Sequence, residues 1–402
     1  MLGIHRIRCG ERITIMSKRV STIPYARQDI THEDIDAVAA VLSSDWLTQG
    51  PKVPEFEHKI SEYCQCSHAV AMNSATSALH AACKALGVGP GDIVWTVPNS
   101  FVASANCARY CGATVDFVDI DAETFNLCLS KLEKKLVSAR NTNSLPKVLI
   151  VVHFGGSPCD MPAVARLAKI YEFSVIEDAS HALGASYNSK YIDTKEGRYQ
   201  EDYIKVGSCK HSDITVFSFH PVKNITSGEG GVATTRNKEL ADRMALFRSH
   251  GISRHVSKNV YQEACEIWNY EQVNLGFNYR MSDIHASLGI SQIGRLDEYT
   301  RLRNNIAKFY WAELNLSSLS PQLVLSGNVS AYHLFVVRLW NTDRIRRRDA
   351  YERLRSAGIL VNVHYIPIHL HPYYRNLGFG RGDFPVAEKY FRECLSLPMY
   401  PM

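Results

Sequence analysis

The sequence lacks a strong excess of charge of either sign. Lys and Arg number 45 and Asp and Glu number 40 among 402 residues, which leaves a formal net charge of +5. Proteins that bind nucleic acid through a basic surface carry a larger and more clustered positive charge, so we expect no nucleic-acid partner. The mild positive balance is compatible with an anionic small-molecule substrate.

Long apolar segments are missing as well. No stretch approaches the roughly 20 apolar residues that cross a bilayer, and the N-terminus lacks the apolar run of a signal peptide. There is no internal repeat and no low-complexity tract. With 46% hydrophobic and 21% charged residues, the composition is typical of a globular protein long enough for two domains. We expect no membrane partner.

The cysteines and histidines show no disulfide or metal pattern. Eleven cysteines at irregular spacing predict reduced thiols and a cytoplasmic location. Cys64 and Cys66 have no nearby ligands to complete a zinc site. His364, His369 and His371 are separated by residues that break any helical presentation, so we expect substrate-loop or packing roles and no metal site.

What is present is an alternation of short apolar runs and helix-like stretches between residues 69 and 235. Near-continuous apolar strands separated by helices predict a mostly parallel sheet that is covered by helices on both faces. The predicted strands are 94–97, 114–118, 148–152, 175–176 and 214–219, and helices are predicted at 162–171 and from Thr31 onward, with Asp34 in a capping box.

Beyond this α/β region the pattern changes. Residues 283–308 predict one long helix that connects two domains. A half-buried strand at 331–339, a helix at 346–357 and a second strand at 359–365 predict a smaller α+β domain. We therefore expect an N-terminal extension (1–22) that is poorly ordered, a large domain (23–270) and a small C-terminal domain (271–402). The polar stretch 191–202 predicts a surface loop.

Lys223 is the most informative residue. It follows the apolar run 214–219 and precedes the glycine-rich segment 228–231. An amine shielded from water at a strand end has a lowered pKa and can act as a nucleophile or base. A lysine that forms a Schiff base with pyridoxal 5′-phosphate (PLP) needs this property. The alternative is an ordinary exposed lysine.

Two upstream elements complete a possible PLP site. Asp178 ends an apolar strand-like run, where ligands of open α/β sheets bind, and could keep the pyridine nitrogen protonated; its alternative role is a helix N-cap. The segment 69–77 leads into a helix-like run from Ala78 to Leu86. Its small hydroxyl residues could hold a phosphate or merely cap the helix. Together the three elements supply partners for the phosphate, the pyridine nitrogen and the aldehyde of one cofactor.

With these residues the chain resembles the sugar-nucleotide aminotransferases of the DegT/DnrJ/EryC1/StrS family, which have the type I PLP-dependent aminotransferase fold. The resemblance runs from about residue 23 to residue 398. It rests on the segments LTQGP (47–51), NSATSAL (73–79), FVASAN (101–106), IEDASHALG (176–184), FSFHPVK (217–223), GEGG (228–231) and GFNYRM (276–281).

The resemblance implies a PLP-dependent transaminase with pyridoxamine 5′-phosphate as intermediate. The implied catalytic residues are Lys223, which would bond to PLP and move a proton, Asp178, which would pair with the pyridine nitrogen, and His181, which would lie close to the ring. Phe101 would stack on the cofactor. The implied phosphate-binding residues are Ser74, Ala75, Thr76, Ser218 and, from the neighbouring subunit of a homodimer with shared sites, Asn278.

Within the family, segments 45–51, 206–209, 248–251 and 364–374 resemble most closely the transaminases of pseudaminic acid biosynthesis. This implies L-glutamate as donor and UDP-2-acetamido-2,6-dideoxy-β-L-arabino-hexos-4-ulose as acceptor, aminated at C4. The alternatives are a transaminase for a GDP- or dTDP-linked keto-sugar and a non-catalytic PLP-binding protein; a dehydratase of the same fold would carry His at position 223. The implied sugar-nucleotide-binding residues are Tyr25, Asp45, Trp46, Leu47, Thr48, Val363, His364, Tyr365, Ile366 and Pro367.

Two differences from the family are expected at the ends of the chain. Family members usually continue beyond the position of Met402 into a closing helix, and residues 1–15 have no counterpart, which makes Met16 a plausible natural start.

Overall fold

The computed structural model describes residues 22–193, 198–253, 268–340 and 344–401. The predicted N-terminal extension, residues 1–22, lies outside these ranges except for Thr22. No helix within the described ranges combines the length and the apolar character needed to cross a bilayer.

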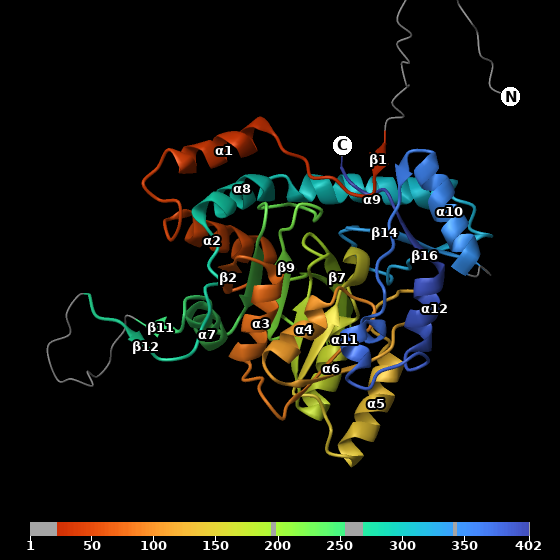
Figure 1. The fold of residues 1–402 in the computed structure, drawn as a ribbon, viewed down its shortest axis with the longest axis horizontal. Helices are drawn as coiled ribbons and strands as arrows, with labels where there is room; N and C mark the ends of the chain where they lie inside the picture. The colour runs from red at the N-terminus through yellow and green to blue at the C-terminus, as the bar shows by residue number, and fades with distance from the viewer. Residues whose placement is uncertain (1–21, 194–197, 254–267, 341–343, 402) are drawn as a thin grey trace, which may run out of the picture.

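A seven-stranded sheet forms the centre of the molecule (Figure 1). Its order is β2 (His68–Met72), β10 (Gly231–Thr235), β9 (Ile214–Ser218), β6 (Ser174–Asp178), β5 (Val148–Val152), β3 (Ile93–Thr96) and β4 (Thr114–Phe117). Only β10 runs antiparallel to its neighbours; β9, β6, β5, β3 and β4 pair in parallel. The predicted mostly parallel sheet is confirmed.

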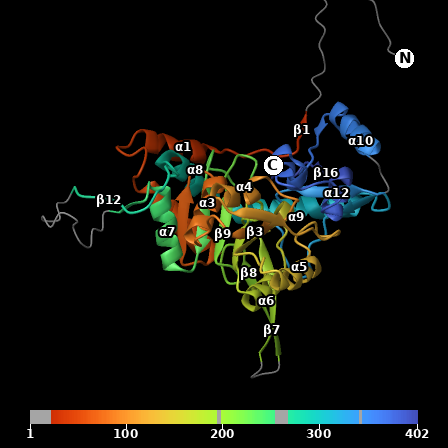
Figure 2. The ribbon, with the colours of Figure 1, turned by 60° about the horizontal axis from the view of Figure 1, so that its bottom comes forward.

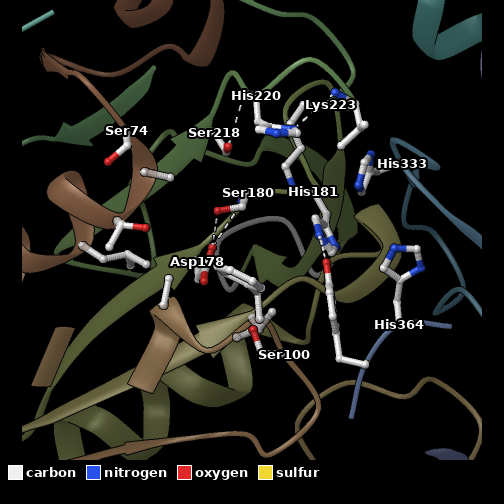
Figure 3. A pocket seen from close by; sticks show the side chains of 18 of the residues that line it. Ser74, Ser100, Asp178, Ser180, His181, Ser218, His220, Lys223, His333 and His364 are labelled. Carbon is white, nitrogen blue, oxygen red and sulfur yellow. Dashed lines mark hydrogen bonds between the residues drawn. The ribbon is translucent and has the colours of Figure 1, made fainter. Parts of the chain in front are cut away.

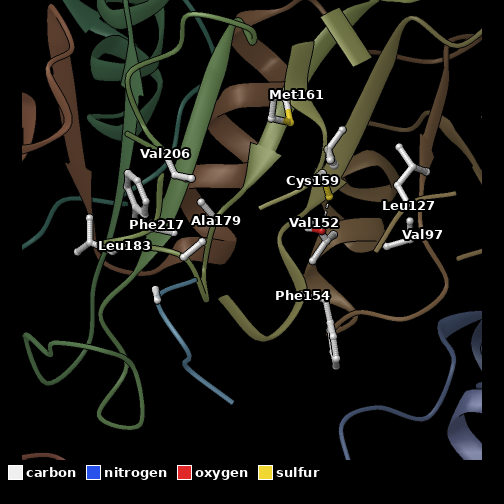
Figure 4. Close-up of a cluster of buried hydrophobic side chains, with 14 of the residues drawn as sticks. Val97, Leu127, Val152, Phe154, Cys159, Met161, Ala179, Leu183, Val206 and Phe217 are labelled. Atoms are coloured by element: carbon white, nitrogen blue, oxygen red, sulfur yellow. Dashed lines mark hydrogen bonds between the residues drawn. The ribbon is translucent and has the colours of Figure 1, made fainter. Parts of the chain in front are cut away.

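Both faces of this sheet are buried, which explains why its strands are apolar at nearly every position. Val148 and Ile150 pack in a cluster with helices α3 (Ala75–Ala85), α4 (Ala103–Tyr110) and α7 (Lys238–Arg248). Leu149 and Val151, which point to the other face, pack with α2 (Lys52–Cys64), α5 (Leu129–Asn141) and α6 (Met161–Tyr171). Figure 4 shows part of this second cluster, with Val152, Met161 and Phe217 labelled.

Local sequence signals predicted two helix starts correctly. Helix α1 (His32–Leu42) begins with a capping box, in which the Thr31 N–H donates a 3.0 Å hydrogen bond to Asp34 Oδ2. Helix α6 begins after Asp160, whose side chain accepts from Ala163 N, and Pro162 occupies its first turn.

The long helix predicted at 283–308 is instead two helices, α8 (Asp283–Ile293) and α9 (Leu296–Glu313). Gly294 closes α8, and glycine has a low helix propensity. Arg295 lies between the helices, where Nη2 donates a 2.6 Å hydrogen bond to Asp34 Oδ2 at the start of α1. This contact favours the break because it ties the junction to another helix.

The C-terminal region forms the predicted smaller α+β unit. An antiparallel sheet of β13 (Leu319–Pro321), β14 (Phe335–Leu339) and β16 (Cys394–Leu397) packs with α10 (Arg344–Ser356) and α12 (Pro385–Glu393). Shorter elements are β11 (Ile252–Ser253), β12 (Glu271–Gln272), two 3₁₀ turns, η1 (Phe154–Gly156) and η2 (Ile368–Leu370), and α11 (Pro372–Arg375).

Two further predictions are wrong. The strand predicted at 359–365 is reduced to β15 (Ile359–Leu360), which pairs with β1 (Ile23–Pro24). The Val363 N–H bonds to the Asn362 side chain instead of a neighbouring strand. The surface loop predicted at 191–202 lies largely in a hairpin of β7 (Ser186–Asp193) and β8 (Arg198–Lys205), which projects from the body (Figure 2).

Candidate active site

A cavity of about 680 Å³ opens at the carboxyl ends of three neighbouring strands. The last residues of β5, β6 and β9, which are Val152, Asp178 and Ser218, all line it. This is where open α/β sheets bind their ligands. The volume lies within the range of about 300–1,000 Å³ that is typical of small-molecule sites.

Asp178 forms the floor of the cavity and is buried. Its Oδ2 accepts a 2.6 Å hydrogen bond from Ser104 Oγ, and its Oδ1 accepts bonds from the Ser180 hydroxyl (2.6 Å) and N–H (3.2 Å). Figure 3 shows the contacts with Ser180. A turn and then β7 follow Asp178, so it does not cap a helix. Its carboxylate is anchored at both oxygens and faces a ligand-sized cavity.

Lys223 lines the same cavity, on the turn that follows β9 (Figure 3). Burial lowers its pKa to about 8, although the Asp178 carboxylate acts in the opposite direction. The neighbouring Asn224 holds this turn, because its Nδ2 donates to the carbonyls of Ala331 (2.9 Å) and Leu183 (3.3 Å). The turn that carries Lys223 is therefore held in place, and the amine is more often unprotonated than that of an exposed lysine.

The N-terminus of helix α3 forms another wall. The helix begins at Ala75, earlier than the predicted Ala78, because the Ser74 side chain accepts from Ser77 N at 3.1 Å and caps it. Gly231 allows β10 to pass close by, since a Cβ there would lie 2.4 Å from the Ala75 nitrogen. Ala75 and Thr76 line the cavity at the first turn of the helix, where free N–H groups favour a phosphate.

The remaining side is lined by His181, from the segment after β6, and by His333, His364 and Tyr365 from the C-terminal region. Burial lowers the pKa of His181 and of His333 well below the usual value, and Lys223 acts in the same direction on both. Burial likewise lowers the pKa of His364 to about 3. These three imidazoles are therefore neutral near pH 7. His181 Nε2 lies 3.1 Å from the Tyr365 hydroxyl.

The cavity brings together most of the predicted cofactor-binding residues. Those that line it are Ser74, Ala75, Thr76, Phe101, Asp178, His181, Ser218 and Lys223. Asn278 lies near the start of α3, where its carbonyl accepts a 3.5 Å bond from Asn73 Nδ2, but it does not line the cavity of its own chain.

The predicted sugar-nucleotide residues divide into two groups. Tyr25, His364 and Tyr365 line the cavity, whereas Val363, Ile366 and Pro367 do not. Residues 45–48 lie between α1 and α2 beside the start of α8, where the Leu47 carbonyl accepts from Asp283 N. Trp46 is 55% exposed there. The geometry of a single chain does not test the predicted role of residues 45–48 in binding the sugar nucleotide, so this role stays a prediction.

Sequence reasoning missed several residues around Asp178 and Lys223. Ser180 carried a local signal, because a serine two residues after an aspartate can fold back onto its carboxylate. Ser100 and Ser104 carried only a weak sequence signal, which is that they are spaced by one helical turn. His333 had none, since it reaches the cavity from a segment more than 100 residues beyond Lys223.

The residues present fit PLP. A helix N-terminus suits its phosphate, an anchored carboxylate suits its pyridine nitrogen, and an amine with a pKa of about 8 suits its aldehyde. Within the described ranges no group of three or more His, Cys, Asp and Glu side chains could hold a metal ion. His369, predicted to have a packing or loop role, is buried with Nε2 3.1 Å from Glu388 Oε1. The nine cysteines in the described ranges are free thiols.

Comparison with protein families gives a match over most of the chain. The model of the DegT/DnrJ/EryC1/StrS aminotransferase family matches residues 28–402. Among characterised relatives, the chain is 38% identical to a UDP-4-amino-4,6-dideoxy-N-acetyl-beta-L-altrosamine transaminase of Campylobacter jejuni, over 94% of this chain and 92% of the relative. It is 37% identical to the spore coat polysaccharide biosynthesis protein SpsC of Bacillus subtilis, over 96% and 94%.

Solved structures give the same result. Helicobacter pylori PseC, described as an aminotransferase involved in the biosynthesis of pseudoaminic acid, superposes with a TM-score of 0.81 at 30% identity and covers 94% of both chains. The PLP form of the putative sugar aminotransferase Spr1654 from Streptococcus pneumoniae superposes with a TM-score of 0.80 at 30% identity, again over 94% of both chains.

Proposed function

Because the chain belongs to the DegT/DnrJ/EryC1/StrS aminotransferase family and is a PLP-dependent sugar aminotransferase, we propose a specific reaction for it. The enzyme transfers the amino group of L-glutamate to C4 of UDP-2-acetamido-2,6-dideoxy-β-L-arabino-hexos-4-ulose, a step of pseudaminic acid biosynthesis. The observation that carries the chemistry is that Lys223 and Asp178 line one cavity together with the N-terminus of α3. The relatives from Campylobacter jejuni and Helicobacter pylori support the choice of acceptor.

The chain's own residues have distinct roles in this proposal. PLP, when bound, supplies an electron sink for the carbon that gains or loses a proton. Lys223 would hold the cofactor at its aldehyde and would move the proton as a base and then as an acid, for which a pKa of about 8 is well suited. Asp178 would pair with the pyridine nitrogen and favour its protonated form, and His181 would bind beside the ring.

The other residues bind and orient. Ser74, Ala75, Thr76 and Ser218, which line the cavity, would hold the phosphate at the start of α3, and Phe101 would cover one face of the ring. Phe101 is 58% exposed in the single chain, which leaves its ring accessible to a flat ligand. Tyr25, His364 and Tyr365 line the part of the cavity that takes the sugar.

We also propose that the enzyme is a homodimer with shared sites. The segment before Asn278 exposes apolar side chains to a degree unusual for a monomer: Trp268 is 70% exposed, Tyr270 63% and Leu275 80%. A partner chain that covers this segment would bring Asn278 to the neighbouring cofactor phosphate and place residues 45–48 at the sugar-nucleotide pocket.

The homodimer is tested with mixed subunits. Chains with Lys223→Ala and chains with Asn278→Ala are each expected to be weak alone, and a refolded mixture should recover activity in hybrid dimers that contain one intact site. A monomer in analytical ultracentrifugation at micromolar concentration would contradict the proposal.

A second candidate acceptor is a GDP- or dTDP-linked 4-keto-6-deoxy sugar, because SpsC, described as a spore coat polysaccharide biosynthesis protein, is about as similar to this chain as the transaminase from Campylobacter jejuni. The direct test is to incubate the PLP-loaded enzyme with L-glutamate and UDP-, GDP- or dTDP-linked 4-keto-6-deoxy sugars and to identify products by mass. Amino-sugar formation from the UDP-linked substrate is expected. Product only from a GDP- or dTDP-linked sugar would contradict the acceptor, and PLP binding without any amino transfer would contradict catalysis.

A further inference from the structure

The turn η1, Phe154–Gly156, contacts both sides of the active-site cavity although Gly155 and Gly156 do not line it. The Gly155 N–H donates a 3.2 Å hydrogen bond to His181 Nδ1. The Gly155 and Gly156 carbonyls accept from Leu334 N and Ala331 N, on either side of His333. The turn therefore links the His181 ring to the C-terminal segment that supplies His333.

The bond from Gly155 determines which nitrogen of His181 carries the proton. A backbone N–H can only donate, so Nδ1 must be an unprotonated acceptor. In a neutral imidazole the proton then lies on Nε2. The ring is kept neutral because it is buried and because the charge of Lys223 faces it, while the His333 ring lies 4.4 Å away, centroid to centroid.

The tautomer of His181 in turn orients the hydroxyl of Tyr365. Nε2–H donates to Tyr365 Oη across 3.1 Å, which occupies one lone pair of this oxygen. The hydroxyl keeps its own proton, because burial raises the pKa of Tyr365. Within the described ranges Tyr365 Oη has no second hydrogen-bond partner, and the residue lines the cavity. Its proton is therefore available for an acceptor atom of a bound molecule.

We propose that Tyr365 donates a hydrogen bond to a keto or hydroxyl oxygen of the sugar substrate, and that Gly155, acting through the tautomer of His181, sets this donor direction. Tyr365 is the residue that touches substrate, and Gly155 and His181 position its proton. The inference rests on the proposed function, since it assumes a sugar acceptor.

The charge of this wall favours the sugar over the glutamate carboxylate. The imidazoles of His181, His333 and His364 are neutral near pH 7, so they offer hydrogen bonds without a positive charge. Lys223 supplies the positive charge that faces these rings, whereas the charge that acts on Tyr365 is that of the Asp178 carboxylate. A carboxylate is held best by a charged donor, whereas a sugar oxygen needs only a neutral one. The rings of Tyr25 and His364, 5.3 Å apart, add an apolar face beside Tyr365.

The first test measures the tautomer without substrate or cofactor. In ¹⁵N-histidine-labelled protein free of PLP, the His181 signals are identified by their loss in His181→Asn. We expect an unprotonated Nδ1, a protonated Nε2 and no titration as the pH falls to about 5. A proton on Nδ1, or titration near the ordinary value of about 6.5, would overturn the proposal.

The second test measures the hydroxyl itself. Tyr365→Phe should raise the KM for the keto-sugar about 2- to 10-fold, as expected for the loss of one neutral hydrogen bond, and leave the half-reaction with glutamate within about twofold. Tyr374→Phe is the matched control, because its buried hydroxyl donates to Asn106 Oδ1, and neither of these residues lines the cavity. An unchanged KM for the sugar, or an increase confined to glutamate, would overturn the proposal.

These outcomes are distinguishable from a failure of the proposed function. If no nucleotide keto-sugar is aminated by the unaltered enzyme, the proposed function fails, and the tautomer experiment still decides whether Gly155 sets the proton of His181.

Discussion

Ser104 Oγ lies 2.6 Å from Oδ2 of Asp178 and donates a hydrogen bond to it from helix α4. The Ser104 hydroxyl also lies 2.7 Å from Ser100 Oγ. These two serines, one helical turn apart, therefore form a chain of hydrogen bonds that ends on the Asp178 carboxylate. Ser180 bonds to the other oxygen. Asp178 therefore faces the cavity in one orientation, with both oxygens engaged as acceptors.

Ser104→Ala should weaken the binding of PLP by roughly 3- to 10-fold, because a hydrogen bond to a charged group contributes about 1.5–3 kcal/mol and part of it is regained by water or rearrangement. The affinity is measured by fluorescence titration of the PLP-free protein with PLP. Ser287→Ala is the control, since this buried serine bonds only to the carbonyl of Ile284 in its own helix. Equal effects of the two substitutions would show that Ser104 has no special role.

Lys223→Ala should abolish the covalent attachment of PLP and reduce amino transfer by roughly 10²–10⁴-fold or more, because both the amine that bonds the aldehyde and the proton-transfer group are lost. The visible absorbance of the bound cofactor and the rate of 2-oxoglutarate formation report the two effects. Lys147→Ala, which removes a surface ion pair with Asp92, serves as control. Normal turnover of Lys223→Ala would exclude the assigned role.

Lys223 should react as a free amine at unusually low pH. With a pKa of about 8, half of its side chains are unprotonated at pH 8, whereas an exposed lysine with a pKa of about 10.4 is almost fully protonated. Limited acylation of PLP-free protein from pH 6 to 11, followed by peptide mass analysis, should give a midpoint near 8 at Lys223. A midpoint near 10 would contradict this.

The lowered pKa of Lys223 also makes the free energy of unfolding depend on pH. Between about pH 8 and 10.4 the unfolded chain binds more protons at this position than the native chain, so the free energy of unfolding of PLP-free protein should rise with pH over that window. Lys223→Met should remove this contribution, and an unchanged pH profile in the variant would place the titration on another group.

Gly156→Ala should destabilise the protein more than Gly378→Ala. Both glycines have positive φ, +96° and +104°, so both substitutions add backbone strain of about 1–3 kcal/mol. At Gly156 the new methyl group would also lie 2.8 Å from the His181 carbonyl and 2.9 Å from Tyr332 N, whereas nothing lies within 4 Å at Gly378. Urea denaturation should show an additional loss of roughly 1–3 kcal/mol for Gly156→Ala. Equal losses of stability in the two variants would mean that the turn at Gly156 rearranges to make room for the methyl group.

Much of the architecture could be predicted because its signals are local. The apolar runs that became β3, β5 and β9 are buried on both faces, so nearly every residue in them had to be apolar. The capping box at Thr31 and the proline in the first turn of α6 act within one helical turn. Asp178 could be singled out because it ends such an apolar run, and Lys223 because it lies shortly after one.

The errors arose where distant contacts decide the local structure. The break between α8 and α9 is stabilised by the bond of Arg295 to Asp34, more than 250 residues away. The hairpin of β7 and β8 depends on pairing between two polar stretches, and polar composition alone favoured a loop. In the strand predicted at 359–365, only Ile359 and Leu360 pair with β1, and Asn362 forms an isolated bridge with Ser396, so the extent of this strand is decided by partners far away in the sequence.

By itself the sequence determined the order of the elements, the two faces of the sheet and the positions of an amine and a carboxylate at strand ends, because periodicity and chain direction are properties of short segments. Only the tertiary structure decided that Ser104 anchors Asp178, that burial lowers the pKa of Lys223, and that Gly155 orients His181 toward Tyr365. Hydrogen-bond direction and burial depend on which distant groups meet, and no short segment specifies that.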